Sequence, residues 1–410
     1  MPSRSITLTL MVTDEQLAGL RAYLQASLSD YLAHLERLVN IDCGSYTKAG
    51  VDEVGRWVVG QLRELGAEVT VEAHETLGDT VVGVLEGSGS RQALVIGHMD
   101  TVFAEGTVAD RPFAIEDGRA LGPGVDDMKG GLLTGLYALR ALRAMGGGPV
   151  ADWLPFARLT FVANSDEEIG SPSSMPIIQR AADGADLALV LESARANGDI
   201  VSARKGNADF RLNLTGRAAH AGVEPEKGRS ATVEAAHKTL ALAALNGRWP
   251  GVTVNVGVIR GGTRPNIVAE SCSLEVDLRA ATAAELEAAE AAIREIAESS
   301  TVPDVSCVIE RAHRWWPMEK TPGTAALVEL AIGLAAQIGF ALRDAATGGA
   351  SDANTTSGMG VATLDGLGPV GGADHAPGEY LEIDSIVPRT TLVAALLLAA
   401  AESAGETATA

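Results

Sequence analysis

The two ends of the chain contain apolar segments with two different periods. Short apolar runs bounded by turn residues predict buried strands, whereas longer segments with apolar residues three or four positions apart predict helices. Strands that alternate with helices at this spacing favour an α/β fold with a largely parallel sheet and helices on both faces. The predicted strands are 68–72, 80–86, 93–97, 159–163, 187–191 and 361–364, and the predicted helices are 14–40, 51–65, the segment after 131, 174–182, 323–339 and the segment from 383.

The middle of the chain has a different pattern. Apolar and polar residues alternate over 209–215, and a helical segment at 230–245 separates this strand from two further strands. Thr282 and Glu285 have the spacing of a capping box, which begins a second helix before the strand 304–310. This βαββαβ order predicts a ferredoxin-like α+β domain.

The change of pattern sets the expected domain boundaries. Residues 205–316 are expected to form an inserted domain, while residues 1–204 and 317–410 form one catalytic domain from both ends of the chain. A length of 410 residues suits two domains, and a hydrophobic content of 46% is sufficient for two cores.

Composition and charge narrow the class of protein. A formal net charge of −21 argues against binding to nucleic acid or to an anionic membrane surface. Cys43, Cys272 and Cys307 are far apart and form no CxxC motif, as is typical of free thiols in a reducing compartment. The N-terminus lacks the apolar core of a secretion signal, and no apolar run reaches membrane-spanning length. We therefore expect a cytoplasmic protein with no nucleic-acid or membrane partner.

Two adjacent acidic residues, Glu167 and Glu168, lie just after the predicted strand 159–163. Open α/β sheets place their chemistry at the carboxyl ends of the strands. Because adjacent side chains on extended backbone point in opposite directions, the two carboxylates are expected to have different roles. One can bind a cation while the other faces the group that the cation activates.

Other polar groups follow predicted strands in the same way. His98 and Asp100 lie on the same side of an extended backbone, so the carboxylate can orient the imidazole toward a metal. Glu192 follows another strand, and His375 lies in a glycine-rich segment. The loop GPGVDDMKGG presents two aspartates before a helix but lacks the spacing of a nucleotide-binding loop.

Together these motifs resemble the dinuclear zinc aminoacylase/carboxypeptidase family, and most closely the bacterial glutamate carboxypeptidases. The similarity extends over nearly the whole chain and rests on long motifs in the same order. They include ALVIGHMDTVFAEGTVADRPF, ALGPGVDDMKGG, FVANSDEEIGS, LTGRAAHAG, GGTRPNIVAESCSLEVDLR and YLEIDSI.

The resemblance implies two zinc ions per chain. His98, Glu192 and Asp127 would bind one ion, and His375, Glu168 and the same Asp127 would bind the other. Three ligand carboxylates and two divalent ions leave one positive charge, which a hydroxide that bridges the ions would neutralise.

The same resemblance assigns roles to residues beside the ligands. The family motif GxGxxDxKG selects Asp127 and leaves Asp126 at a variable position, where a solvated side chain is expected. Asp100 would be the partner of the first histidine. Glu167 would be the general base, which takes the proton of the zinc-bridging hydroxide as it attacks the carbonyl and delivers that proton to the leaving amine. A cis peptide bond between Asp127 and Met128 is also implied.

The resemblance further implies a set of substrate-side residues. His220 would reach across a homodimer formed by the inserted lid domain and would hydrogen-bond the oxyanion in the second active site. Asn266 and Arg279 match lid residues near the substrate, and an arginine is a suitable clamp for a free carboxylate. Gly349 and Ser351 match a loop that approaches the substrate with its backbone N–H groups.

The sequence therefore predicts a homodimeric zinc hydrolase that acts on a small peptide or an N-acyl amino acid. It would cleave an amide bond next to a free carboxylate and release a C-terminal amino acid such as glutamate. An N-acyl-amino-acid amidohydrolase is the alternative, and a dipeptidase, an aminopeptidase or a non-catalytic binding protein is less favoured. Glutamate preference stays open, because the segment Arg204-Lys205-Gly206 differs from the glutamate-specific relatives and no motif fixes a pocket for a side-chain carboxylate.

Overall fold

The computed structural model describes residues 12–401, which form two compact units. The sequence predicts an inserted segment at 205–316, whereas the observed second unit begins at residue 203 and its main segment ends at residue 319. Most of the N-terminal segment in which no secretion signal is expected lies outside the described residues. Unit 1 comprises the chain up to Ser202, Lys320–Ala346 and the chain from Ser351 on, and unit 2 comprises Ala203–Glu319 and Thr347–Ala350.

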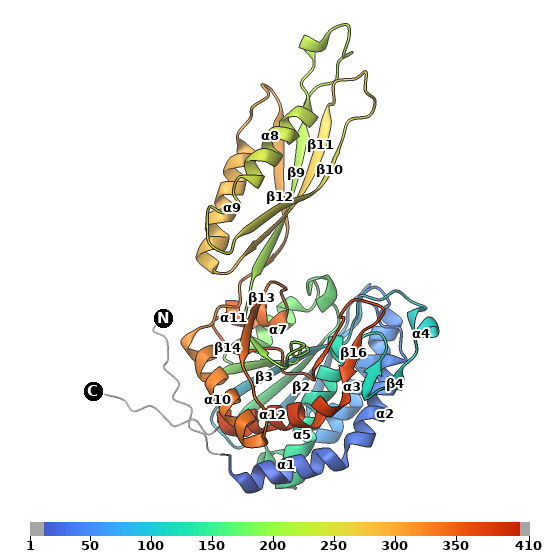
Figure 1. Cartoon of the computed structure of the whole chain (residues 1–410), viewed down its shortest axis with the longest axis vertical. Coiled ribbons are helices and arrows are strands. Elements are labelled where there is room, and N and C mark those ends of the chain that lie inside the picture. Colours follow the sequence, from blue (N-terminus) through green and yellow to red (C-terminus); the bar gives the residue numbers. More distant parts are fainter. Residues whose placement is uncertain (1–11, 402–410) are drawn as a thin grey trace, which may run out of the picture. The chain divides into compact units, whose positions relative to one another are not determined.

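A six-stranded sheet forms the centre of unit 1 (Figure 1). Its strands, in spatial order, are β1 (Glu68–Glu72), β2 (Thr80–Glu86), β6 (Arg158–Asn164), β3 (Gln92–His98), β7 (Leu187–Val190) and β14 (Ala362–Leu364). The last four are parallel, and β2 and β1 extend the sheet as antiparallel strands. The middle strands are buried on both faces, which explains why their sequences are continuous apolar runs.

Helices cover both faces of this sheet, as the alternating pattern predicts. The helices of unit 1 are α1 (Asp14–Ala26), α2 (Leu28–Val39), α3 (Lys48–Leu65), α4 (Thr107–Asp110), α5 (Gly131–Gly146), α6 (Val150–Trp153), α7 (Met175–Ala182), α10 (Pro322–Ile338), α11 (Asp352–Gly358) and α12 (Ile383–Ala401). On one face α3, α5 and α10 pack against β2, β3 and β14, and on the other α7 and α11 pack against β6 and β7. The largely parallel α/β fold class of unit 1 is therefore confirmed.

The predicted long N-terminal helix is two helices, because the chain bends at Ser27. This residue has φ −92° and ψ 1°, which is outside the helical range, and its N–H still donates to the carbonyl of Tyr23. The bend lets each helix bury its own apolar face, with Leu20 in α1 and Leu35 in α2 fully buried.

Helix α12 is long and apolar enough to cross a membrane, with a mean hydropathy of 1.6 over its most apolar window. By length and composition alone α12 is a candidate span, although Asp384 and Arg389 interrupt its apolar residues. However, 72% of that window is buried inside the protein, and α12 contacts α1, α5 and α10. Burial in the core of unit 1 explains its apolar composition.

A small second sheet in unit 1 carries the glycine-rich segment with His375. Its strands, in spatial order, are β15 (Gly371–Gly372), β16 (Tyr380–Glu382), β5 (Arg119–Leu121) and β4 (Ala114–Glu116). His375 lies on the loop between β15 and β16, so this sheet holds that loop next to the turn that follows β5.

Unit 2 has the predicted βαββαβ order. Its elements are β9 (Gly206–Thr215), α8 (Ala231–Ala243), β10 (Thr253–Gly261), β11 (Ser271–Ala280), α9 (Ala283–Glu298) and β12 (Ser306–Trp315), with the short 3-10 turn η3 (Pro225–Lys227) before α8. The strands form one antiparallel sheet in the order β10-β11-β9-β12. Alternate residues of β9 are buried against the two helices, as its period of two predicts. The chain passes between the units along β8 (Ile200–Arg204) and β13 (Asp344–Thr347), which pair with each other.

Candidate metal centre

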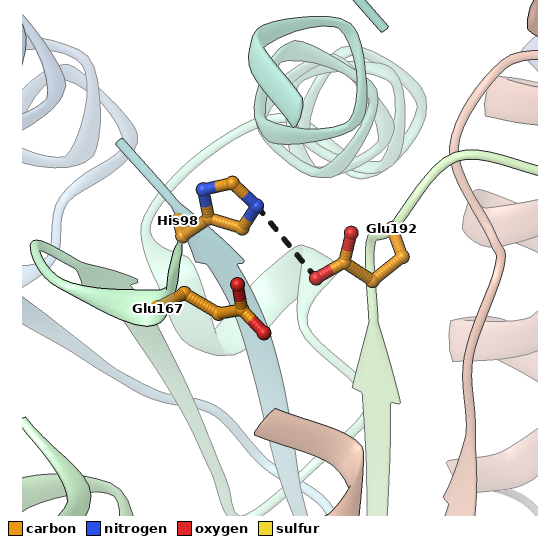
Figure 2. Close-up of side chains that lie close together, drawn as sticks. All are labelled: His98, Glu167 and Glu192. Carbon is orange, nitrogen blue, oxygen red and sulfur yellow. Dashed lines mark ion pairs between the residues drawn. The ribbon is translucent and has the colours of Figure 1, made fainter. Parts of the chain in front are cut away.

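The candidate metal centre lies at the carboxyl ends of the parallel strands of unit 1. His98 is the last residue of β3, and Glu192 follows β7 after one residue. Glu167 and Glu168 begin the 3-10 turn η2 (Glu167–Ile169), which follows β6. His98, Glu167 and Glu192 are buried, and their side chains converge (Figure 2). This is the edge at which open α/β sheets bind ligands.

Asp127 lies between the two histidines. Its Oδ1 is 3.0 Å from Nε2 of His98, and its Oδ2 is 3.1 Å from Nε2 of His375. Oε1 of Glu192 is 3.7 Å from Nε2 of His98, and Oε2 of Glu168 is 3.1 Å from Nε2 of His375. The structure thus brings the five predicted ligands together as two histidine–carboxylate groups that share Asp127.

The turn that carries Asp127 is irregular. Asp127 lies in the π-helical turn η1 (Val125–Gly130), and its own backbone angles, φ −109° and ψ 95°, are not helical. The peptide bond from Asp127 to Met128 is cis, as the resemblance implies. Lys129 is buried beneath the turn and donates to the carbonyls of Pro123 (3.1 Å) and Ile41 (3.3 Å).

The two halves of the centre differ in exposure. The side chain of His98 is 1% exposed, whereas that of His375 is 53% exposed. His375 has φ 61°, in the left-handed region that histidine adopts more often than most residues. The centre is therefore closed on the side of His98 and accessible to a substrate on the side of His375.

The donor atoms fit divalent metal binding. Imidazole nitrogens and carboxylate oxygens are the ligands of catalytic zinc sites. Oε1 of Glu168 is buried and has no hydrogen-bond partner within the described part of the chain, so a cation is a suitable partner for it. Donor atoms of His98, Glu167 and Glu192 lie within 4.8 Å of one another, as do those of His98, Asp127 and Glu168. Asp127 has an oxygen only 3.0 Å from His98, so we favour Asp127 over Glu167 as the ligand beside that histidine.

Negative charge is concentrated in this small volume. Burial raises the pKa of Glu192 to about 8. Burial, followed by repulsion from the Glu192 carboxylate, raises the pKa of Glu167 well above its usual range. Burial opposes protonation of His98, but the Glu192 carboxylate and hydrogen bonds to Asp100 and Asp127 outweigh it and raise the pKa of His98. Bound cations would remove this repulsion and keep the carboxylates ionised.

Asp100 connects β3 to the turn that carries the two glutamates. Its carboxylate accepts the backbone N–H of Glu167 (3.1 Å), the backbone N–H of Glu168 (3.2 Å) and the hydroxyl of Ser45 (2.6 Å). Nδ1 of His98 is 3.0 Å from the backbone oxygen of Asp100 and 3.4 Å from its Oδ1. Asp100 therefore holds both the imidazole and the turn in place.

The expectation that Asp126 is solvated is wrong. Its side chain is fully buried and packs against Gly371, where a side chain would collide with it. The turn η1 points Asp126 inward, toward the loop between β15 and β16. Burial, followed by the nearby Asp374 carboxyl, raises the pKa of Asp126 well above its usual range and favours the neutral acid.

Sequence reasoning misses Glu379. This residue is 2% exposed, and its carboxylate accepts the backbone N–H groups of Gly124 (2.9 Å), Asp126 (2.9 Å) and Asp127 (3.1 Å). Because Glu379 lies on the same loop as His375, it joins the segments of two predicted ligands. In the sequence, Glu379 is simply the second acidic residue of GGADHAPGEY. Nothing in this segment indicates a hydrogen bond to Asp127, 252 residues away.

Three predicted substrate-side residues lie in unit 2. His220 and Asn266 are exposed and lie on neighbouring segments, because the residue after His220 donates its N–H to the Asn266 carbonyl (3.0 Å). Arg279 lies at the far end of β11 from Asn266, with Nε 3.2 Å from Asp277 and Nη1 3.0 Å from the carbonyl of Gly348. The structure thus pairs His220 with Asn266 and separates both from Arg279.

Gly349 and Ser351 belong to different units. The carbonyl of Gly349 accepts a hydrogen bond from Arg204 (3.1 Å) within unit 2. Ser351 is the N-cap of α11 in unit 1, where its hydroxyl donates to Asp365 (2.6 Å) and its N–H to Asn354 (2.9 Å). The hydroxyl and N–H of Ser351 therefore both make hydrogen bonds within the fold.

A family model and several known proteins match this sequence. The model of peptidase family M20/M25/M40 matches residues 94–399. Carboxypeptidase G2 from Pseudomonas sp. (strain RS-16) is 33% identical over 371 residues, which cover 89% of this chain and 87% of that protein. Acetylornithine deacetylase from Proteus mirabilis (strain HI4320) is 29% identical over 234 residues, which cover 53% of this chain and 57% of that protein.

Solved structures share the fold at lower identity. Aminopeptidase PepT from Bacillus cereus has a TM-score of 0.74 at 24% identity and covers 92% of this chain and 99% of its own. An M20 family metallo-carboxypeptidase from Sulfolobus solfataricus has a TM-score of 0.70 at 16% identity, with 90% and 98% covered. The family match and the similarity to Carboxypeptidase G2 confirm the resemblance found in the sequence: this chain belongs to peptidase family M20/M25/M40 and is a metal-dependent hydrolase.

Proposed function

We propose that this hydrolase acts as a carboxypeptidase on small peptides or N-acyl amino acids that carry a free carboxylate next to the scissile amide. The main support is the arrangement of two histidine–carboxylate groups around Asp127, with the carboxylate of Glu167 beside them. Similarity to Carboxypeptidase G2 over most of both chains supports this reaction type.

In this proposal the metals are two zinc ions. His98, Glu192 and Asp127 would hold one ion, and His375, Glu168 and Asp127 the other. When bound, such ions would polarise the scissile carbonyl and lower the pKa of the attacking water. The nitrogen and oxygen donors favour zinc over magnesium or calcium, which prefer oxygen ligands alone.

Glu167 is proposed as the general base. Its carboxylate is buried and lies within 4.8 Å of the donor atoms of His98 and Glu192. A carboxylate held beside the metals can accept a proton from the attacking water and return it to the leaving amine. Asp100 would keep Glu167 in position through its backbone N–H.

On the substrate side, we propose that Arg279 binds the free carboxylate and that Asn266, Gly349 and Ser351 make further contacts. His220 would donate a hydrogen bond to the oxyanion of a second copy, in a homodimer formed through unit 2 as the lid. The exposure of His220 and Asn266 on neighbouring segments supports a role toward another molecule.

We propose the cytoplasm as the compartment. Cys43, Cys272 and Cys307 are free thiols, which suits a reducing environment.

A deacylase that removes an acyl group from an amino acid is the second candidate. Similarity to acetylornithine deacetylase favours it, although that similarity covers about half of this chain. Both reactions cleave an amide next to a free carboxylate, so the same centre serves either one.

The test is a hydrolysis panel with the zinc-loaded protein. It contains N-acyl amino acids and N-blocked dipeptides, their C-terminal amides, and dipeptides with a free amine. We expect cleavage of the N-blocked substrates and its loss when the terminal carboxylate is amidated. Cleavage that requires a free amine would instead indicate an aminopeptidase or dipeptidase.

A further inference from the structure

The segment that carries Glu167 and Glu168 is a short loop whose two ends are held together by side chains. We call residues 164–171 the glutamate loop. It begins at Asn164, the last residue of β6, and ends at Ser171, which follows η2. The Asn164 amide donates to the Ser171 hydroxyl (2.9 Å), and both side chains are fully buried. The ends of the glutamate loop are therefore fixed inside the fold of unit 1.

Asp352, from a segment much later in the chain, binds both ends of the glutamate loop. Its Oδ2 accepts a hydrogen bond from the Asn164 amide (2.6 Å), and its Oδ1 accepts one from the Ser171 hydroxyl (2.6 Å). Asp352 is only 1% exposed. Hydrogen bonds to an ionised acceptor are stronger than those between neutral groups, so one carboxylate holds the two ends firmly.

The start of α11 fixes Asp352 in turn. Asp352 is the first residue of this helix, and Ser351 before it is the N-cap, whose hydroxyl accepts the N–H of Ala353 (3.1 Å). The same hydroxyl donates to Asp365 (2.6 Å), and α11 packs against α7 and β7. Asp352 therefore connects the glutamate loop to a well-supported part of unit 1.

The glutamate loop depends on such outside support. Its helical part, η2, is a single 3-10 turn of three residues, and Asp166 before it provides no side-chain cap. A turn this short is not stable by itself. Asp100 accepts the backbone N–H groups of Glu167 and Glu168, while Asp352 holds the ends of the loop. The two aspartates thus hold different parts of the loop.

The charge of Asp352 is costly for stability. The amide and the hydroxyl that it binds carry no charge, and burial raises its pKa from 3.8 to about 6. An asparagine would avoid the cost of a buried charge, but its single oxygen cannot accept from both ends of the loop. A carboxylate here is therefore better explained by the position that it gives to the loop than by stability.

We propose that Asp352 is a positioning residue, which sets the place of the Glu167 carboxylate by holding both ends of the glutamate loop. The inference rests on the proposed role of Glu167 as general base. Asp352 acts through the side chains of Asn164 and Ser171 and not on the substrate itself.

The test is a double-mutant cycle between Asp352→Asn and Glu167→Gln, with zinc-saturated protein and a substrate from the hydrolysis panel. We expect Asp352→Asn to lower kcat by about 10–100-fold, the usual cost of losing a supporting partner, with KM nearly unchanged. In the Glu167→Gln background the same change should lower kcat by less than about threefold, because the base that it misplaces is already absent. A loss of the same size in both backgrounds, or an unchanged kcat in Asp352→Asn, would overturn the proposal.

Two further variants separate positioning from folding. Asn164→Asp combined with Asp352→Asn exchanges the amide and the carboxylate, and should recover most of the kcat that Asp352→Asn loses. Thr356→Val is the control, because Thr356 is also buried on α11 but its hydroxyl lies 3.0 Å from that of Thr363, in β14. It should keep the kcat of the wild type. An equal loss in Thr356→Val and Asp352→Asn would show a general effect of α11 and would contradict the proposal.

A failure of the proposed function is distinguishable from a failure of this inference. If the zinc-loaded wild type hydrolyses none of the panel, the proposed reaction is wrong. Amide hydrogen exchange of residues 165–170 then decides the role of Asp352. Asp352→Asn should speed this exchange by about tenfold, the effect of one lost hydrogen bond on local opening, and Thr356→Val should not change it. Equal exchange in all three proteins would refute the positioning role.

Discussion

Glu167 and Glu168 are neighbours in sequence, but their side chains face different groups. Oε2 of Glu168 is 3.1 Å from His375, in the half of the centre that is exposed to solvent. The carboxylate of Glu167 instead faces His98 and Glu192 (Figure 2). Because their contacts differ, removal of the Glu167 carboxylate should affect the protein differently from removal of the Glu168 carboxylate.

We expect Glu167→Gln to lower kcat by about 10²–10⁴-fold, the usual contribution of a general base, with metal content nearly unchanged. Glu168→Gln should instead reduce the zinc content per chain, since it removes a proposed ligand. Zinc analysis after reconstitution, measured beside the turnover of both variants, checks this. Loss of zinc from Glu167→Gln alone would mean that the two roles are exchanged.

Glu379 contacts the candidate metal centre through the backbone of Asp127. We expect Glu379→Gln to weaken zinc affinity by about 10–100-fold, as is typical when a partner behind the ligands is lost. An amide keeps the shape of the carboxylate but cannot accept three N–H donors as strongly. Competition with a zinc chelator measures the affinity directly.

Glu382→Gln is the control, because Glu382 lies on β16 and pairs with Arg119 (2.8 Å) away from the backbone of Asp127. Equal zinc affinity in Glu379→Gln and Glu382→Gln would show that the three hydrogen bonds do not matter to the ligand turn.

At the scale of elements, α8 of unit 2 is joined to the end of α9 by a buried ion pair. Lys238 donates to the carbonyls of Ile296 (2.8 Å) and Ala297 (3.1 Å) in the last turn of α9. Glu234 lies 3.2 Å from Lys238 and accepts the N–H of Val302 (2.7 Å) after that helix. The pair therefore provides the carbonyl and N–H partners that the end of α9 requires.

The pair should make unit 2 sensitive to acid. Burial opposes ionisation of Glu234, but the N–H of Val302 and the Lys238 ammonium outweigh it and lower its pKa from 4.5. A lowered folded-state pKa adds stability above the unfolded value, and this stability is lost as pH falls through the folded value. Glu234→Gln should lower the unfolding free energy by about 3–5 kcal/mol at pH 7, and the difference should shrink below pH 4.

Urea unfolding at pH 7 and at pH 3.5 checks this expectation. Glu224→Gln removes an exposed partner of Lys227 on η3 and should change stability by less than about 0.5 kcal/mol at either pH. A pH-independent difference for Glu234→Gln would contradict the titration of Glu234.

The strands and helices could largely be predicted from the spacing of apolar residues, because each buried strand of unit 1 is a continuous apolar run. The break at Ser27 could not, since the apolar period runs through it. The burial of Asp126 and the hydrogen bonds of Glu379 could not be predicted for another reason. Their environment comes from contacts between η1 and a loop about 250 residues later, and local sequence carries no sign of such a pairing.

At the scale of the whole molecule, the proposed homodimer can be tested by mixing inactive chains. If His220 acts on the second copy, His220→Ala and Glu167→Ala should complement each other after subunit exchange. One site of the heterodimer then has both residues, so activity should recover to about half the wild-type value per dimer. Labelled chains are needed to demonstrate the exchange.

Loss of an oxyanion donor typically costs about 10²–10³-fold in rate, so the recovery is large enough to measure. If activity does not recover in exchanged dimers, His220 acts within its own chain and not on the second copy. A fully active monomer would have the same meaning.

The insertion of unit 2 within unit 1 has a consequence for biosynthesis. A ribosome releases residues 203–319 as a nearly complete domain while unit 1 still lacks α10, β14 and α12. Domains generally fold as units during synthesis, so the inserted domain can mature before its host. His375 and Glu379 emerge after the inserted domain and after α10 and β14. The complete set of proposed ligands is therefore not available to a metal until well after the inserted domain has left the ribosome.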